Sequence, residues 1–326
     1  MRSIVTRTLI AFSLLALMAS LLAGCAKQGE KYPTKAIEYV CQASAGGSSD
    51  KFVRSVVKAL EDQKLISVPI SVANKAGGGG AIAFNYVKGK EGDPYFLLNT
   101  SGNFIAANLR DPSVPGHKDF TPICRFAFDL NTVIVSANSP YKTMADLVNA
   151  AKANPGKINW AGTSVGSQDH LTVLTLQRVS GTKFSFVSFT GSNEVLAALL
   201  GGHVQVGCAE PWVAKAQADA GKVRILGLGA EARLKGLPDV PTLKEQGYDV
   251  VVYMQRGVVA AGKIPESARK YLVNAFTKLG NSQAWKDFLA NEGLMEGFLA
   301  GDDYAKFLAE ETAKWQGLLK EAGVIK

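Results

Sequence analysis

The repeated alternation of short apolar segments with longer amphipathic segments constrains the fold of this 326-residue chain more than any other feature of its sequence. Residues 36–42 (AIEYVCQ), 67–74 (SVPISVAN) and 95–101 (YFLLNTS) have the composition of β-strands, and residues 50–63 carry apolar side chains at helical spacing. Strands that alternate with helices form parallel sheets with helices on both faces. The sequence therefore predicts a doubly wound α/β fold.

The same alternation occurs a second time further along the chain. Thr143 is placed to cap the first helix of this second series, and the chain from residue 265 onward is predicted to be helical. A chain of this length exceeds what one hydrophobic core usually serves, so we expect two α/β units. The strands of the second series are predicted at 131–138, 157–163, 184–190, 203–210 and 223–231.

The N-terminus has the pattern of an export signal. Arg2 and Arg7 precede an apolar run from Leu9 to Gly24, which is shorter than a membrane-spanning helix and ends in LAGC. LAGC resembles the lipobox of bacterial lipoproteins, in which the cysteine is acylated after cleavage. We expect residues 1–24 to be a lipoprotein signal peptide and Cys25 to carry the lipid anchor; an unmodified thiol beside a soluble-secretion site is the alternative.

The composition argues against several classes of function. The formal net charge of +8 suits an anionic ligand, but no Lys/Arg run with interleaved aromatic residues supports nucleic-acid binding. The three histidines and the cysteine spacing make no metal-ligand pattern, and we expect neither a metal nor a cofactor. An odd number of cysteines remains after Cys25, and we interpret them as buried apolar residues, with one bridging pair as the alternative: Cys41, Cys124 and Cys208.

The glycine-rich loop SAGGSSD, residues 44–50, follows the first predicted strand and opens the first predicted helix. It lacks the Gly-Lys-Ser/Thr of a P-loop and the spacing of a dinucleotide fingerprint. Its glycines allow a ligand to approach the backbone, and the helix start offers N–H groups and partial positive charge to an anion. An ordinary turn capped by Ser49 or Asp50 is the alternative.

The loop AGTSVGSQDH, residues 161–170, contains a Gly-x-Ser-x-Gly pattern around Ser164. A secreted serine esterase is therefore an alternative function for the chain. The histidines that follow, His170 and His203, lie too close along the chain to suit the triad of such an enzyme. We interpret His170 as a helix residue packed near a cleft, and the loop as a counterpart of residues 44–50.

Seven segments of the sequence together resemble one family of proteins. They are KYPTKAIEYV, AGGSSD, NKAGGGG, NPGKINWAGTSVGSQDHL, FTGSNEVLAALLGGHV, AGKVRILGLG and LPDVPTLKEQGY, in this order along the chain. In these segments the chain is similar to the periplasmic substrate-binding receptors of tripartite tricarboxylate transporters, the Bug/TctC family. LPDVPT and the block from PGK to HL are more specific than the glycine loops.

The resemblance implies a type II periplasmic binding protein fold, in which two doubly wound α/β domains enclose a ligand cleft and are joined by two chain crossings. Residues 25–34 become a tether, residues 35–130 with 236–326 the first domain, and residues 131–235 the second. Loops of both domains then cradle a carboxylate through amides and hydroxyls, and Ser164 donates a hydrogen bond. The expected ligand-binding residues are Ser44, Gly46, Gly47, Ser49, Asp50, Thr100, Asn103, Thr163, Ser164, Gly166, Ser167, Thr190 and Ser192.

Arg256 joins this set as a candidate for binding a second carboxylate in bidentate fashion, with a surface or interdomain salt bridge as the alternative. The chain differs from the family pattern at Gln42, Ser44 and Gln205 and in the segment GCAEPW, and these differences bear on the ligand rather than on the fold. The resemblance implies a non-catalytic, membrane-anchored receptor of the periplasm or extracytoplasmic face. It would deliver a di- or tricarboxylate to membrane permease subunits; signalling to a sensor kinase is a further alternative.

Overall fold

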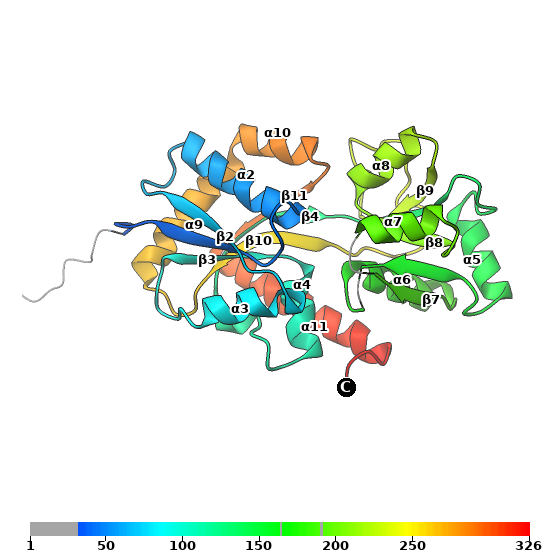
Figure 1. Cartoon of the computed structure of the whole chain (residues 1–326), viewed down its shortest axis with the longest axis horizontal. Coiled ribbons are helices and arrows are strands. Elements are labelled where there is room, and N and C mark those ends of the chain that lie inside the picture. Colours follow the sequence, from blue (N-terminus) through cyan, green and yellow to red (C-terminus); the bar gives the residue numbers. More distant parts are fainter. Residues whose placement is uncertain (1–31, 164, 190–191) are drawn as a thin grey trace, which may run out of the picture. The chain divides into compact units, whose positions relative to one another are not determined.

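The computed structural model describes residues 32–163, 165–189 and 192–326, and its two β-sheets lie in one unit, Lys35–Lys326 (Figure 1). The signal peptide, most of the tether, Cys25, Ser164 and Thr190 lie outside the described residues. No helix in the described part of the chain is long and apolar enough to cross a membrane.

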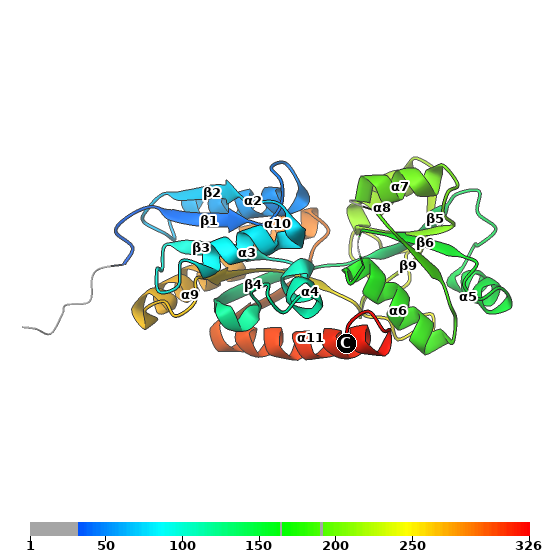
Figure 2. The same cartoon turned by 60° about the horizontal axis from the view of Figure 1, so that its bottom comes forward.

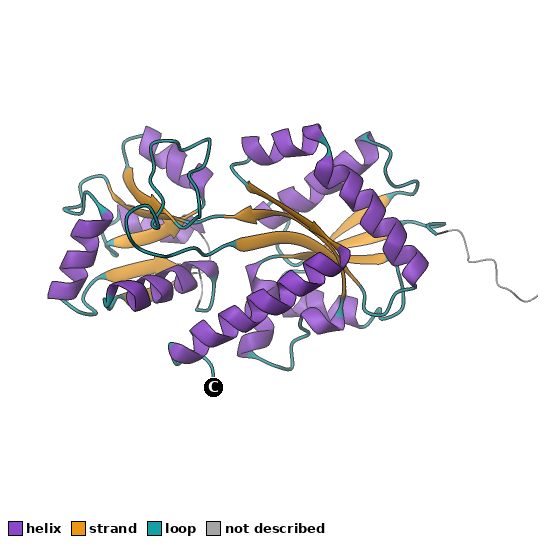
Figure 3. Cartoon of the chain, turned by 180° about the vertical axis from the view of Figure 1, so that it is seen from behind, coloured by secondary structure: helices purple, strands orange, loops and turns teal. Residues whose placement is uncertain are grey.

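The first sheet has six strands in the order β11-β4-β10-β3-β1-β2. Strands β1, β2 and β3 are parallel, whereas β10 runs antiparallel to β3 and β4, and β11 antiparallel to β4. Helices cover both faces of this sheet (Figure 3). Its strands are Ile37–Cys41 (β1), Ile70–Asn74 (β2), Phe96–Thr100 (β3), Thr121–Asp129 (β4), Met254–Ala260 (β10) and Met295–Ala300 (β11).

Aromatic side chains form much of the core of this first lobe, which we define as the first sheet and its helices. Phe126 of β4 packs against Phe52, Phe276 and Trp285, which come from α2, α9 and α10. Phe84 of α3 packs edge-on against Phe104 of α4. The helices of this lobe are Ser48–Asp62 (α2), Ala81–Lys88 (α3), Gly102–Arg110 (α4), Glu266–Asn281 (α9), Gln283–Asn291 (α10) and Gly301–Glu321 (α11), with short 3-10 turns at Gly78–Gly80 (η1) and His117–Asp119 (η2).

The second sheet has five strands in the order β7-β6-β8-β5-β9, and with its helices it forms the second lobe. Strand β6 is parallel to β7 and β8, and β5 is antiparallel to β8 and β9. Its strands are Thr132–Ser136 (β5), Asn159–Gly162 (β6), Ser185–Ser188 (β7), Val206–Ala209 (β8) and Val223–Leu228 (β9); its helices are Met144–Ala153 (α5), Gln168–Ser180 (α6), Ser192–Leu200 (α7) and Pro211–Asp219 (α8).

Successive side chains of the second sheet enter different cores. Val133 and Val135 pack with α5 and α6, whereas Ile134 between them packs with α7 and α8. In β6, Trp160 likewise packs in the first of these cores and its neighbour Ala161 in the second. This follows from the strand geometry, because neighbouring residues point to opposite faces of a sheet. Both faces of the second sheet are therefore buried.

Two chain crossings and one helix connect the lobes. Strand β4 passes to β5 through residues 130 and 131, and the chain returns through residues 229–253. Gln168, at the start of α6, donates hydrogen bonds from Nε2 to the carbonyls of Asp129, at the end of β4, and Val252, in the returning segment, at 3.1 and 2.9 Å. Helix α11 lies beside both α4 and α6 (Figure 2), and its Trp315 belongs to a hydrophobic cluster that includes Ile105 of α4 and residues of the second lobe. A side chain of α6 thus contacts both connections between the lobes, and α11 contacts a helix of each lobe.

The two-domain α/β fold expected from the sequence is confirmed. The prediction that the tail is entirely helical is wrong at β11, which pairs with β4. The parallel arrangement holds for β1–β3 and β6–β8, but the antiparallel strands were not predicted. Residues 241–243 hydrogen-bond to Leu228 of the second sheet, and the domain limits at 130 and 235 stay a prediction. The three cysteines at 41, 124 and 208 are buried and free, as interpreted.

Candidate functional site

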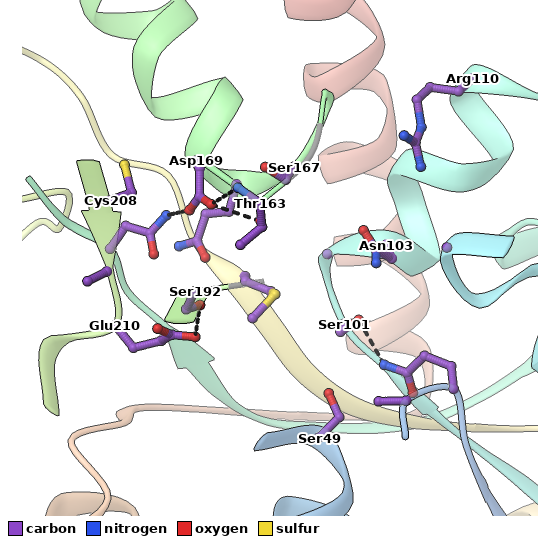
Figure 4. A pocket seen from close by; sticks show the side chains of 18 of the residues that line it. Ser49, Ser101, Asn103, Arg110, Thr163, Ser167, Asp169, Ser192, Cys208 and Glu210 are labelled. Atoms are coloured by element: carbon purple, nitrogen blue, oxygen red, sulfur yellow. Dashed lines mark hydrogen bonds between the residues drawn. The ribbon is translucent and has the colours of Figure 1, made fainter. Parts of the chain in front are cut away.

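A cavity of about 650 Å³ lies between residues of the two lobes (Figure 4). The first lobe contributes residues that follow β1 and β3, and the second lobe contributes residues that follow β6 and end β8. Ligands of open α/β sheets bind at the carboxyl ends of parallel strands, which is where these residues stand. The lining residues are Gln42, Ala43, Ser49, Gly78, Gly79, Ser101, Gly102, Asn103, Arg110, Asn131, Thr163, Ser167, Gln168, Asp169, Ser192, Cys208, Ala209, Glu210 and Met254.

Helix starts from both lobes meet at this cavity. Ser49 lies in the first turn of α2, Asn103 in that of α4, Gln168 in that of α6 and Ser192 in that of α7, and Glu210 is the N-cap of α8. The first N–H groups of a helix have no partner within the helix, and its N-terminus carries partial positive charge. The cavity therefore has the electrostatic character of an anion site built mainly from backbone.

The two loops expected to mirror each other have the same local geometry. Gly46 and Gly166 each stand two residues before a helix and have φ of +78° and +79°, a conformation that favours glycine. The amide of Gly46 donates to Asp50 Oδ2 at 2.8 Å, and the amide of Gly166 donates to His170 Nδ1 at 3.0 Å. In both loops a side chain four residues ahead thus holds the turn that leads into the helix.

Asp169 positions Thr163 on the wall of the second lobe. Its Oδ2 accepts hydrogen bonds from the amide and the hydroxyl of Thr163 at 2.7 and 2.8 Å, and its Oδ1 accepts one from Asn131 Nδ2. Burial raises the pKa of Asp169 and outweighs these hydrogen bonds, which act to lower it. Both carboxylate oxygens are engaged, so Asp169 acts as an internal support of the loop.

His170 has the role that the sequence predicts. Its ring accepts the Gly166 amide hydrogen and lies 4.4 Å from the ring of Phe186, centroid to centroid. Burial lowers the pKa of His170 to about 4, so the ring is neutral at physiological pH and can accept that hydrogen. His170 is thus a neutral helix residue whose ring has a hydrogen-bond partner, the Gly166 amide.

Thr100 belongs to a buried network behind the cavity. Its hydroxyl lies 2.8 Å from that of Tyr304, which in turn donates to Gln255 Oε1 at 2.8 Å. Gln42, by contrast, lines the cavity, where it donates to Ser101 Oγ and accepts from Asn99. The polar wall expected at Gln42 is therefore present and is held in place by neighbouring strands.

Arg256 is buried, with 3% of its surface exposed, and its guanidinium forms a salt bridge with Asp129 at the end of β4. It also donates to Ser49 Oγ at 3.0 Å and to Ser48 Oγ at 2.7 Å, in the first turn of α2. Arg256 lines a second cavity of about 970 Å³, which adjoins the first. Its positive charge is thus engaged within the first lobe, and direct contact of Arg256 with a ligand stays a prediction.

The structure brings together five of the residues expected from the sequence on the wall of the 650 Å³ cavity: Ser49, Asn103, Thr163, Ser167 and Ser192. The adjoining cavity takes three more, Gly46, Gly47 and Arg256, and shares Ser192. Four of the expected residues line neither: Ser44, Asp50, Thr100 and Gly166. Ser164 and Thr190 lie outside the described residues.

Three charged residues of the wall, Asp169 described above and the two that follow, were not among the expected ligand-binding residues. Arg110 ends α4, and its Nη1 donates to the carbonyl of Val165 in the second lobe at 3.0 Å. A cation in the last turn of a short helix is ordinary, so nothing in the sequence marked it. Glu210 lies in the segment GCAEPW, whose departure from the family pattern was the available signal. Each residue depends on its tertiary neighbours for its place in the site.

A family model and a curated relative each match most of the chain. The model of the "Tripartite tricarboxylate transporter family receptor" family, TctC, matches residues 53–324. A protein of Cupriavidus necator called "UPF0065 protein in gbd 5'region" is 32% identical over 305 residues, which cover 92% of this chain and 91% of that protein.

Two solved structures show the same fold. A TctC solute binding protein from Polaromonas, without ligand, is 26% identical with a TM-score of 0.75, and the match covers 89% of this chain and 99% of that one. Rpa4515 of R. palustris with adipate is 24% identical with a TM-score of 0.79, covering 90% and 98%. The family match spans most of the chain, as the resemblance in the sequence indicated. The chain belongs to the TctC family of tripartite tricarboxylate transporter receptors.

Proposed function

We propose that this protein is an extracytoplasmic solute-binding receptor that captures a small carboxylate and releases it unchanged to membrane permease subunits of a tripartite tricarboxylate transporter. The observation that carries the proposal is the cavity into which helix starts of both lobes converge. Di- and tricarboxylates are the first class to test, because the family carries their name and its relative Rpa4515 was solved with adipate.

The charges and dipoles of the residues that line the 650 Å³ cavity support the binding of an organic anion. Backbone N–H groups at helix starts bind carboxylates without a compensating side-chain charge. Serine, threonine and asparagine side chains stand beside these groups and can donate further hydrogen bonds. A carboxylate that contacts both lobes would favour their closed arrangement, because it gains contacts there that a separated pair of lobes does not offer.

The location of the receptor rests on the sequence. Residues 1–24 have the features of a lipoprotein signal peptide, and acylation of Cys25 would tether the unit 35–326 to a membrane. Mass spectrometry of the protein purified from its host membrane tests this directly. A diacyl or triacyl modification on Cys25 at the new N-terminus supports the anchor, whereas an unmodified or absent Cys25 contradicts it.

Capture is tested by a thermal-shift screen of the purified full chain in detergent, followed by calorimetry. A ligand present at 100 times its Kd adds about 2.7 kcal/mol to the free energy of unfolding, which gives a clear rise in Tm. Carboxylic acids are compared with their neutral amides, which keep the shape and remove the charge. We expect acids to raise Tm and amides not to.

Asn103→Ala provides the matched site variant, because Asn103 lines the cavity. Asn291→Ala is the control, because Asn291 is an exposed residue at the end of α10. We expect the first variant to weaken binding of the best acid and the second to leave it unchanged. If no carboxylic acid raises Tm, or if acids and amides act alike, the proposed function is wrong.

A further inference from the structure

Glu210 places a carboxylate with an unused hydrogen-bond acceptor on the cavity wall. The residue follows β8 and is the N-cap of α8, but its side chain does not cap that helix. Its Oε1 accepts a hydrogen bond from Ser192 Oγ at 3.1 Å (Figure 4). Its Oε2 is buried and has no hydrogen-bond partner among the described residues. A buried carboxylate oxygen without a partner costs free energy until a donor reaches it.

Two carboxylates, those of Asp129 and Asp169, act on Glu210, which also borders the adjoining cavity with Lys51, Arg54 and Arg256. Burial raises the pKa of Glu210, and the nearby charges of Asp129 and Asp169 raise it further. The starts of α7 and α8 favour the ionised form. Arg256 does not supply a free countercharge in the first lobe, because its guanidinium is paired with Asp129. A second carboxylate of a ligand placed here would therefore meet repulsion.

The positive charge of the cavity lies on the other wall. Among the described lining residues, Arg110 is the one with a positive side chain, and it belongs to the first lobe together with Asn103 and the start of α4. In Figure 4 Arg110 and Asn103 face the group formed by Asp169, Glu210 and Ser192 across the cavity. The cavity thus has its cation on the wall of the first lobe and two carboxylates, Asp169 and Glu210, on the wall of the second lobe, while helix starts lie on both walls.

We propose that Glu210 is a specificity-determining residue and that the ligand is an amino-carboxylate, whose ammonium group donates to Glu210 while its carboxylate lies at the helix starts and Arg110 of the first lobe. An ammonium supplies both the missing hydrogen bond and the opposite charge that this wall lacks. The inference rests on the proposed capture of carboxylates and narrows its ligand class.

Glu210→Gln isolates the charge. The amide oxygen of glutamine can still accept from Ser192, so the substitution keeps the shape of the side chain and removes the negative charge. Glu292→Gln is the control, because Glu292 is an exposed acid that borders the adjoining cavity and does not line this one. Melting temperature and circular dichroism of each full-length variant verify that it is folded.

Calorimetry measures the affinity of each variant for ligands that are matched in length and differ in the group at one end. The probes are glutarate, 5-aminopentanoate and 5-hydroxypentanoate, with the corresponding four-carbon set as a second length. We expect the unaltered protein to bind the amino-carboxylate at least about tenfold more tightly than the dicarboxylate of the same length. Glu210→Gln removes this preference and improves dicarboxylate binding, whereas Glu292→Gln keeps it.

The outcomes separate this inference from the proposed function. If a dicarboxylate binds best and Glu210→Gln leaves the ratio unchanged, carboxylate capture stands and the role of Glu210 is wrong. If the hydroxy acid binds more tightly than the amino acid, the ammonium is the wrong donor and the ligand class is overturned. If none of these acids and no tricarboxylate binds, the proposed function itself fails.

Discussion

Asp50→Asn tests whether an ionised carboxylate holds the loop of residues 44–50. Asp50 Oδ2 accepts from the Gly46 amide at 2.8 Å, its Oδ1 accepts from Asn74 at 2.9 Å, and Arg54 Nε lies 3.0 and 3.1 Å from the two oxygens. Burial acts to raise the pKa of Asp50, but the hydrogen bonds and charge of these partners outweigh it and lower the pKa from 3.8 to about 2. The ionised form therefore stabilises the folded chain.

The size of the effect follows from that shift. It corresponds to about 2.4 kcal/mol at roughly 1.36 kcal/mol per pKa unit. The side chain of Arg54 is 53% exposed, and solvent screens part of its contribution. We therefore expect Asp50→Asn to lower the free energy of unfolding by about 1–2 kcal/mol at pH 7. Because the pKa is lower in the folded than in the unfolded chain, this contribution is present above about pH 4 and is lost as the pH falls toward 2.

Urea unfolding followed by circular dichroism at pH 7, 5 and 3 measures the effect. The control is Asp62→Asn in the same helix, where the ion pair with Lys58 is 60% and 75% exposed at its two side chains. We expect that control to change the free energy of unfolding by less than about 0.5 kcal/mol. The reasoning is refuted if both variants lose the same stability, or if the loss in Asp50→Asn is the same at pH 7 and pH 3.

Two further predictions concern groups beside the cavity. Arg256→Ala leaves Asp129 buried without its cation and should lower the free energy of unfolding by about 3–5 kcal/mol. Adding Asp129→Ala should recover part of that loss, as measured by chemical denaturation. Losses that simply add in the double variant would contradict the pairing. Burial lowers the pKa of His170 to about 4 from 6.5, so the unfolded chain takes up a proton that the folded chain does not, and stability falls as the pH drops through this window. His170→Asn keeps an acceptor for the Gly166 amide and should flatten the Tm profile between pH 7 and 5; an unchanged slope would rule His170 out as its source.

Local sequence was sufficient for most of the elements. Helical spacing predicted α2 and α5, an amphipathic segment predicted α6, and the predicted cap Thr143 does accept the Asp146 amide hydrogen at the start of α5. The caps considered for α2, Ser49 or Asp50, are wrong, because α2 begins after Gly47 without a side-chain cap. Strand β11 was missed because MEGFLA has no clear alternation and is held as a strand by its pairing with β4. The antiparallel strands were missed for a related reason. Whether a strand runs parallel or antiparallel depends on which strand lies next to it, and those neighbours can be far apart along the chain.

The residues of the candidate site also fall into those that the sequence predicted and those that depend on tertiary packing. Glycine and hydroxyl residues at strand-to-helix turns were readable, and Ser49, Thr163 and Ser167 do line the cavity. The resemblance to the family placed Thr100 there, but Thr100 ends β3 and its hydroxyl is engaged in the network with Tyr304. The direction of one side chain at a strand end depends on the packing of a helix that comes much later in the chain.

The sequence by itself determined the alternation of strands and helices, the two turns that open α2 and α6, and the family to which the chain belongs, because these depend on residues that are neighbours along the chain. Only the tertiary structure decided the charges of the cleft. Strand order brings Asp129 to Arg256, and the meeting of the two lobes sets Glu210 opposite Arg110. Electrostatic interactions act through space, so which charges neutralise each other and which remain for a ligand is settled when distant segments come together.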